Sequence, residues 1–126
     1  MEQGDRPAAI RCLREAAWLA PHYKTLELLG ECLRGEGREP EAVLYLAAAA
    51  GLGRKQARAR FLLAGALLAC GQHYAWDAAQ QLRECLRVSP NFKTARELLE
   101  RVLRENPDVA QRMRRDEETG ANDDER

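Results

Sequence analysis

The chain has 126 residues, the size of one domain; 45% of them are hydrophobic, largely alanine and leucine, and 32% are charged. This mixture is typical of helices with one apolar stripe and one solvated face, and the scarcity of β-branched residues argues against a sheet. Twenty basic and twenty acidic side chains give a formal net charge of zero, which argues against a nucleic-acid binder that uses a field of one sign.

Prolines, glycines and apolar periodicity divide the chain into a series of helices. Asp5 and Pro7 suit the start of a first helix, and Pro21 ends it because the residue before a proline avoids the helical region. Gly35 and Gly37 end the second helix in the same way that glycines end many helices. The predicted helices span residues 7–19, 22–34, 40–50, 55–70, 76–88 and 92–105.

Each predicted helix has an apolar stripe at helical spacing. The first, third and fifth helices have small, large and small residues in that order, whereas the second, fourth and sixth have stripes rich in leucine. In chain order, the residues expected to face inward are Ala9, Leu13 and Ala16; Leu26, Leu29, Gly30 and Leu33; Ala42, Leu46 and Ala49; Leu63, Ala64 and Leu67; Ala78, Leu82 and Cys85; and Ala95, Leu99, Val102 and Leu103.

Apolar residues become rare after Pro107, and residues 114–126 read RRDEETGANDDER. A segment with so little to bury does not repay the entropy of ordering it. We therefore expect residues 107–126 to form a charged, disordered tail, and a chain that ends near Asn106 to be about as stable as the whole.

The chain also repeats itself. Gly30 and Ala64 are 34 residues apart, and so are Gly37 and Gly71, a period typical of stacked helix–turn–helix units. Together with the stripes above, this pattern resembles the tetratricopeptide repeat (TPR) family over residues 5–106. The resemblance implies an all-α, right-handed solenoid of antiparallel helix pairs, with about six helices in a helical repeat domain over residues 1–106.

In this reading, a half repeat lies on each side of the full repeats. A half repeat covers residues 5–21, two full repeats cover 22–54 and 55–90, and a second half repeat covers 91–106. Half repeats leave an apolar flank uncovered at each end of an array. The alternative to a peptide-binding scaffold is therefore a structural assembly subunit, which self-associates or stacks on a larger complex through these ends.

In TPR arrays the first helix of each repeat lines a concave groove. The resemblance therefore implies a non-catalytic scaffold or adaptor that binds a peptide or protein in this groove. The sequence leaves open whether Phe61 and Leu62 contact a ligand or simply pack against a neighbouring helix. Carried over by position, the expected partner-binding residues are Lys24, Glu27, Glu31, Arg34, Arg58, Phe61, Leu62, Glu97, Arg101 and Arg104.

Aromatic residues are few. Trp18 lies at the end of the first predicted helix, on its outer or inter-repeat side. Tyr74 and Trp76 lie in a turn that the comparison of the two full repeats predicts to be lengthened. These two side chains either form an exposed hot spot or fold back over the helix ends, and the second reading is preferred.

The sequence contains no motif that indicates catalysis. His22 and His73 lie in predicted turns without a Ser or Cys at a spacing that suits nucleophilic catalysis, so we expect no enzyme and no cofactor. The four cysteines form no CxxC pair, so we expect reduced core thiols rather than a disulfide or a metal site. They are Cys12, Cys32, Cys70 and Cys85.

The N-terminal sequence, MEQGD, lacks the basic and then apolar order of a secretory signal. The apolar stretches of the chain are too short to span a bilayer. We therefore expect a cytoplasmic protein whose partner is a protein or peptide, with homo-oligomers possible and with neither nucleic acid nor a membrane as a partner.

Overall fold

The computed structural model describes residues 6–52 and 57–119 of the chain. This part folds into seven α-helices and one short 3-10 helix, η2. In chain order they are α1 (Arg6–Leu19), α2 (Tyr23–Gly35), α3 (Glu39–Leu52), α4 (Ala57–Cys70), η2 (Gln72–Tyr74), α5 (Ala75–Val88), α6 (Lys93–Glu105) and α7 (Pro107–Thr119). The six predicted helices are all present, although the predicted start of the fourth, Lys55, lies outside the described residues.

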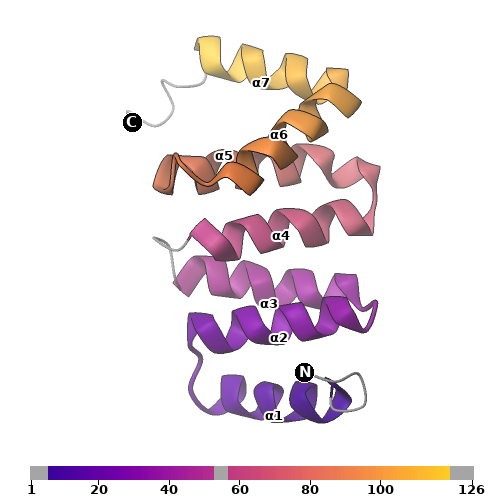
Figure 1. Cartoon of the computed structure of the whole chain (residues 1–126), viewed down its shortest axis with the longest axis vertical. Helices are drawn as coiled ribbons and strands as arrows, with labels where there is room; N and C mark the ends of the chain where they lie inside the picture. The colour runs from indigo at the N-terminus through magenta and orange to yellow at the C-terminus, as the bar shows by residue number, and fades with distance from the viewer. Residues whose placement is uncertain (1–5, 53–56, 120–126) are drawn as a thin grey trace.

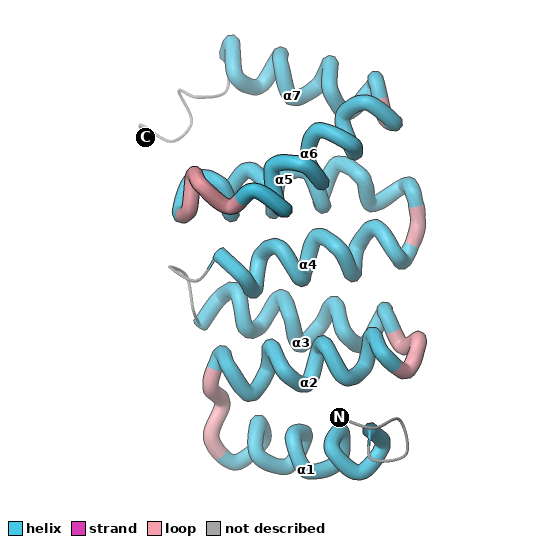
Figure 2. The backbone as a smooth tube through the Cα atoms, viewed as in Figure 1, coloured by secondary structure: helices cyan, strands magenta, loops and turns pink. Residues whose placement is uncertain are grey.

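The helices form a stack, with α1 at the bottom and α7 at the top of the view in Figure 1. Each helix packs on the helix that follows it in sequence, and in addition α2 contacts α4 and α5 contacts α7. The described connections are short, as the pink segments in Figure 2 show. Short connections favour antiparallel neighbours, and the buried residues accordingly run through the stack as successive apolar clusters.

A glycine turn joins α2 to α3. Gly37 has a φ of 75°, a backbone conformation that side chains with a Cβ atom rarely adopt. Its N–H donates to the Arg34 carbonyl at 2.9 Å, and the Arg38 N–H donates to the Leu33 carbonyl at 2.8 Å. These bonds satisfy carbonyl groups that the end of α2 would otherwise leave without partners, so the chain reverses sharply into α3.

Close approach between α2 and α3 depends on Gly30. A Cβ atom placed on Gly30 would lie 2.5 Å from Cγ of Leu46. Leu46 is fully buried, as are Ala42 and Ala49 one turn to either side of it. The predicted order of small and large residues is therefore confirmed here, and its effect is that a leucine of one helix fills the space above a glycine of the other.

Alanine-rich surfaces also pack α4 between α3 and α5. Ala59, Ala64 and Ala66 of α4 are fully buried, and Leu63 is nearly so. On α5 the predicted stripe is buried along its whole length. Small residues on facing helices allow the backbones to approach closely, which explains why a helix as apolar as α4 lies in the middle of the stack.

The prediction for α1 was right for two of its three residues. Ala9 and Leu13 pack on the core, but Ala16 is exposed, and Ile10 and Ala17 are buried instead. Because adjacent residues of a helix point about 100° apart, Ala16 points away from the side that Ala17 occupies. Cys12 is exposed as well, and so it is not the core thiol that was predicted.

The predicted disordered tail is also wrong over most of its length, because α7 is a helix. Val109 and Met113 of α7 are buried in the cluster that α4, α5 and α6 share. These residues are four positions apart and lie on one face of the helix. Two apolar side chains are enough to dock α7 because α5 and α6 already provide an apolar surface for them. The rest of the predicted tail, residues 120–126, lies outside the described residues.

The turn before α5 is longer than the turn before α3, as predicted: it spans 71–74 and contains η2, compared with 36–38. Trp76 belongs to the helix that follows. Trp76 is half-buried against the core, and the Arg112 guanidinium of α7 lies 3.8 Å from the centre of its ring. Tyr74 is half-buried as well, with its ring beside that of His73. The reading in which these aromatic residues fold back is therefore confirmed.

Candidate functional site

Three of the predicted partner-binding residues pair with one another. Arg58 of α4 donates to Glu27 at 3.1 Å and to Glu31 at 2.8 Å, and both of these glutamates lie on α2. The arrangement joins two helices that are not neighbours in sequence. These charges therefore have partners within the chain, and any peptide that used them would compete with α4 or α2.

Three more of these residues are occupied by packing. The Phe61 ring lies against the Phe92 ring, with centroids 5.1 Å apart, and Leu62 packs on the core cluster of α1 to α4. Arg34 lies over Gly65, since a Cβ atom on that glycine would be 2.8 Å from an Arg34 guanidinium nitrogen. For Phe61 and Leu62, the structure favours the reading in which they pack against neighbouring helices.

The remaining four predicted residues, on α2 and α6, point toward solvent. Lys24, Glu97 and Arg101 are exposed. Arg104 is exposed too and lines a hollow of about 480 Å³ where α5, α6 and α7 meet. The structure therefore brings predicted residues of α2 and α4 together, since Arg58 pairs with Glu27 and Glu31, while the predicted residues of α6 are exposed.

A larger hollow lies elsewhere, between α1 and α3 and beside α2. Its volume is about 970 Å³, within the range that binding sites in proteins have. We name it the α1–α3 groove. It is lined by Arg11, Arg14, Glu15, Ala17, Trp18, Pro21, Leu26, Leu44, Tyr45, Ala48, Gly51 and Leu52.

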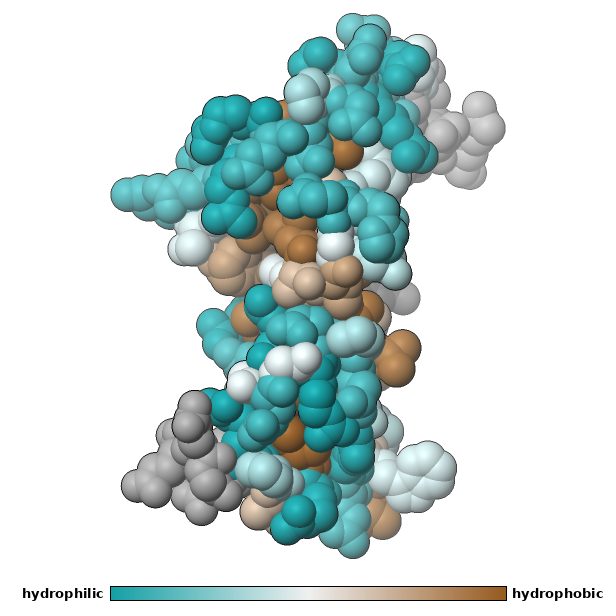
Figure 3. Space-filling model, turned by 90° about the vertical axis from the view of Figure 1, so that its right-hand side faces the viewer, coloured by the Kyte–Doolittle hydropathy of each residue, from teal (hydrophilic) through white to brown (hydrophobic). Residues whose placement is uncertain are grey.

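The walls of the α1–α3 groove expose large apolar side chains. Trp18 is 87% exposed, Leu44 is 69% exposed and Leu52 is 56% exposed. Hydrophilic residues cover much of the face shown in Figure 3, and hydrophobic residues gather near its middle. Three large apolar side chains are thus exposed around one hollow, and exposed apolar patches often mark interaction sites in proteins.

The helix arrangement explains why this groove exists. Both α1 and α3 pack on α2. The surfaces of α1 and α3 that do not contact α2 leave a hollow between these two helices. Sequence reasoning missed the groove because it followed the small and large stripe of α3 and ignored the rest of that helix. The useful signal was that the sequence of α3 is apolar on all sides, whereas a helix covered on one side only should have a polar face.

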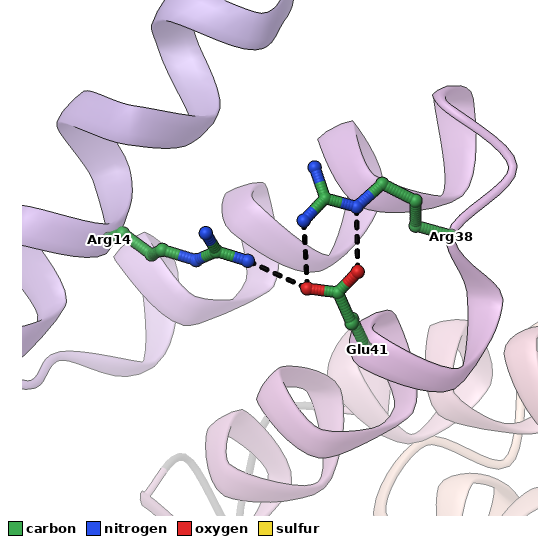
Figure 4. Close-up of polar contacts among 3 residues, drawn as sticks. All are labelled: Arg14, Arg38 and Glu41. Atoms are coloured by element: carbon green, nitrogen blue, oxygen red, sulfur yellow. Dashed lines mark hydrogen bonds and ion pairs between the residues drawn. The ribbon is translucent and has the colours of Figure 1, made fainter.

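An ion-pair cluster joins α1 to α3, as Figure 4 shows, and its Arg14 also lines the groove. Glu41 accepts two hydrogen bonds from Arg38, at 2.7 Å and 2.8 Å, and a third from Arg14 at 2.7 Å. The hydrogen bond from Arg38, followed by the charges of both arginines, holds the pKa of Glu41 below its usual value, although partial burial opposes the shift. The same bond raises the pKa of Arg38.

We expect Glu41→Gln to loosen α1 from α3 and to lower the melting temperature slightly at neutral pH. Because the pKa of Glu41 is lower in the folded state, its contribution is complete above the ordinary value of 4.5 and is lost as the pH falls through the depressed value. The difference between the two proteins should therefore shrink at acidic pH. Thermal melts followed by circular dichroism from neutral to acidic pH measure this, and a difference that grows on acidification would contradict it.

Two of the four cysteine thiols, Cys32 and Cys85, are buried. Burial raises the pKa of Cys32 and of Cys85, while the nearby Arg6 and Arg60 respectively act in the opposite direction. A thiol whose pKa is raised stays protonated at neutral pH and is a poor nucleophile and metal ligand. Among residues 6–52 and 57–119, no group of three His, Cys, Asp or Glu side chains is placed to hold a metal ion.

No helix in the described part of the chain has the length and apolar character that crossing a membrane requires. No family model matches this chain, and no curated protein matches it either. Membership of the TPR family and the winding of the helix pairs into a solenoid are therefore proposals. The structure itself shows an all-α stack whose helices, within the described residues, pack mainly with their sequence neighbours.

Proposed function

We propose that this chain is a non-catalytic protein-interaction module of the TPR type, a scaffold that receives an apolar segment of a protein in the α1–α3 groove. The observation that carries the proposal is the exposure of Trp18, Leu44 and Leu52 around one hollow of about 970 Å³. Burial of one apolar side chain of this size contributes about 1.5–3 kcal/mol of favourable free energy, so burying these side chains would favour association.

The α1–α3 groove is a better candidate than the predicted concave face of α2, α4 and α6. On that face, Arg58 is paired with Glu27 and Glu31, and Phe61 is packed on Phe92. A ligand there would first have to break contacts that stabilise the fold. In the α1–α3 groove the apolar walls face solvent, so a ligand would gain contacts without displacing any.

The chemistry of the groove supports binding rather than catalysis. Its described lining contains apolar residues, two arginines, one glutamate and one tyrosine. Most of these side chains exclude water and offer no proton-transfer pair, and the nearest hydrogen-bonded charges belong to the Arg14–Glu41 ion pair. Such a lining suits an apolar protein segment held between two helices.

We expect Leu44→Arg to abolish the retention of proteins that the immobilised wild-type chain captures from an extract of cells that express it. The arginine would place a charge among apolar walls and remove the burial of a leucine. Leu28→Arg is the matched control, since Leu28 is also an exposed leucine, at 46%, but does not line the groove. Mass spectrometry identifies the retained proteins, and circular dichroism checks that both variants stay folded. Equal retention by both variants would refute the assignment of the groove.

A further inference from the structure

The α1–α3 groove and a side chain suited to fill it belong to the same surface. Trp18 lies on the rim and is the most exposed large apolar residue among those described, at 87%. Leu19, next to it, is 80% exposed. Tryptophan dominates interface energies when a pocket buries it. The chain therefore presents an apolar projection beside an apolar hollow, and its own fold satisfies neither of them.

The rim of the groove has charges of both signs. Arg11 and Glu15 are exposed, lie one turn apart on α1, and have no ion-pair partner among the described residues. Arg14 donates to Glu41, which also accepts from Arg38. Within residues 6–52 and 57–119, the rim therefore offers the cation Arg11 and the anion Glu15 to the opposite charges of a copy of itself, whereas it matches poorly with a segment whose charges are all of one sign.

We infer that the occupant of the α1–α3 groove is a second copy of this chain, with Trp18 of each copy inserted into the groove of the other. A twofold interface uses the same patch on both subunits, so that patch must be complementary to itself, as a projection beside a hollow is. The formal net charge of zero removes the long-range repulsion that two identical charged chains would have. The inference rests on the proposed function, because it takes the groove to be a protein-binding site.

Self-association is tested by sedimentation equilibrium of the full chain from about 1 to about 300 µM. We expect the mass to rise with concentration from the 14.2 kDa of one chain toward twice that value. Tryptophan fluorescence follows the contact directly, because Trp18 leaves water on association whereas Trp76 is half-buried against the core in each copy. The emission should therefore shift to shorter wavelength as the dimer forms.

Two neighbouring alanines provide a matched pair of variants. Ala47 and Ala48 are both exposed on α3, but only Ala48 lines the groove. We expect Ala48→Arg to raise the dissociation constant about 30-fold or more, the factor that loss of a buried aromatic anchor typically produces. Ala47→Arg should leave it unchanged, and Trp18→Ala should weaken the dimer as much as Ala48→Arg does.

Mixing the two weakened variants separates insertion of Trp18 from a general loss of apolar surface. The Trp18→Ala chain retains the rest of the groove lining, Ala48 included, and the Ala48→Arg chain retains its tryptophan. Their heterodimer keeps one of the two insertions, whereas each homodimer keeps neither. We therefore expect the mixture to associate more tightly than either variant alone, and a mixture no tighter than its components would overturn the exchange of Trp18.

The outcomes distinguish this inference from the proposed function. A dimer that Ala48→Arg and Trp18→Ala leave intact would use another surface and would overturn the inference. A chain that stays monomeric at every concentration would overturn it as well. If Leu44→Arg abolished capture of a different protein by such a monomer, the proposed function would stand without the dimer. If Leu44→Arg left that capture unchanged, the proposed function and the inference would both fail.

Discussion

Replacing Leu46 with alanine is expected to destabilise the protein by about 2–5 kcal/mol, the range for a leucine removed from a packed core. Leu46 is fully buried, and its side chain fills the space above Gly30. The loss combines burial of the isobutyl group with the cavity that remains. Urea unfolding followed by circular dichroism measures the change in the free energy of unfolding.

The control lies two residues away on the same helix. Leu44 is 69% exposed, so Leu44→Ala removes the same atoms from a site in contact with water. We expect a change of roughly 0.5 kcal/mol or less, the usual size at surface positions. Equal losses for the two variants would show that the α2–α3 contact is not packed as described.

Removing α7 is expected to have the second large effect. A chain that ends at Asn106 leaves out Val109 and Met113, which are buried against α5 and α6. Burial of two such side chains contributes roughly 3–6 kcal/mol, an upper estimate because an unfolded chain already hides part of its apolar surface. The truncation also removes Arg112 from the face of Trp76. The midpoint of urea unfolding should fall accordingly.

A chain that ends at Thr119 is the matching control, since it removes only residues 120–126 and keeps the whole of α7. Its unfolding midpoint should stay close to that of the full chain. If the chain that ends at Asn106 were equally stable, the disordered tail predicted from the sequence would be restored and the docking of α7 would be refuted.

Local rules were sufficient to predict most of the helices. Apolar spacing on one side of a helix depends only on residues within a few turns, and it correctly placed Leu29, Leu46 and Leu82 at helix contacts. The rule was ambiguous for α1, where Ala9 and Leu13 do pack on the core but Ile10 and Ala17 are more deeply buried than the predicted Ala16. Sequence alone could not choose between Ala16 and Ala17, because the choice depends on which face α2 covers.

The rest depends on contacts between distant parts of the chain. For α7, two apolar residues looked too few because the sequence does not show the surface that α5 and α6 leave open. For the predicted partner-binding residues, position in a repeat did not reveal that Arg58 pairs with Glu27 and Glu31. The groove between α1 and α3 arises because both helices pack on α2, an arrangement of distant segments that no short sequence pattern encodes.

The position of α1 at the end of the stack affects how readily this helix detaches from α2. Internal helices such as α3 and α4 are held from two sides, whereas α1 packs mainly on α2. In a structure held by neighbour contacts, the terminal unit detaches at a lower free energy than global unfolding requires. Detachment of α1 removes one wall of the α1–α3 groove, so only the docked form can bind there. By linkage, a bound protein adds its binding free energy to the docking of α1, and the order of this helix rises with the concentration of whatever occupies the groove.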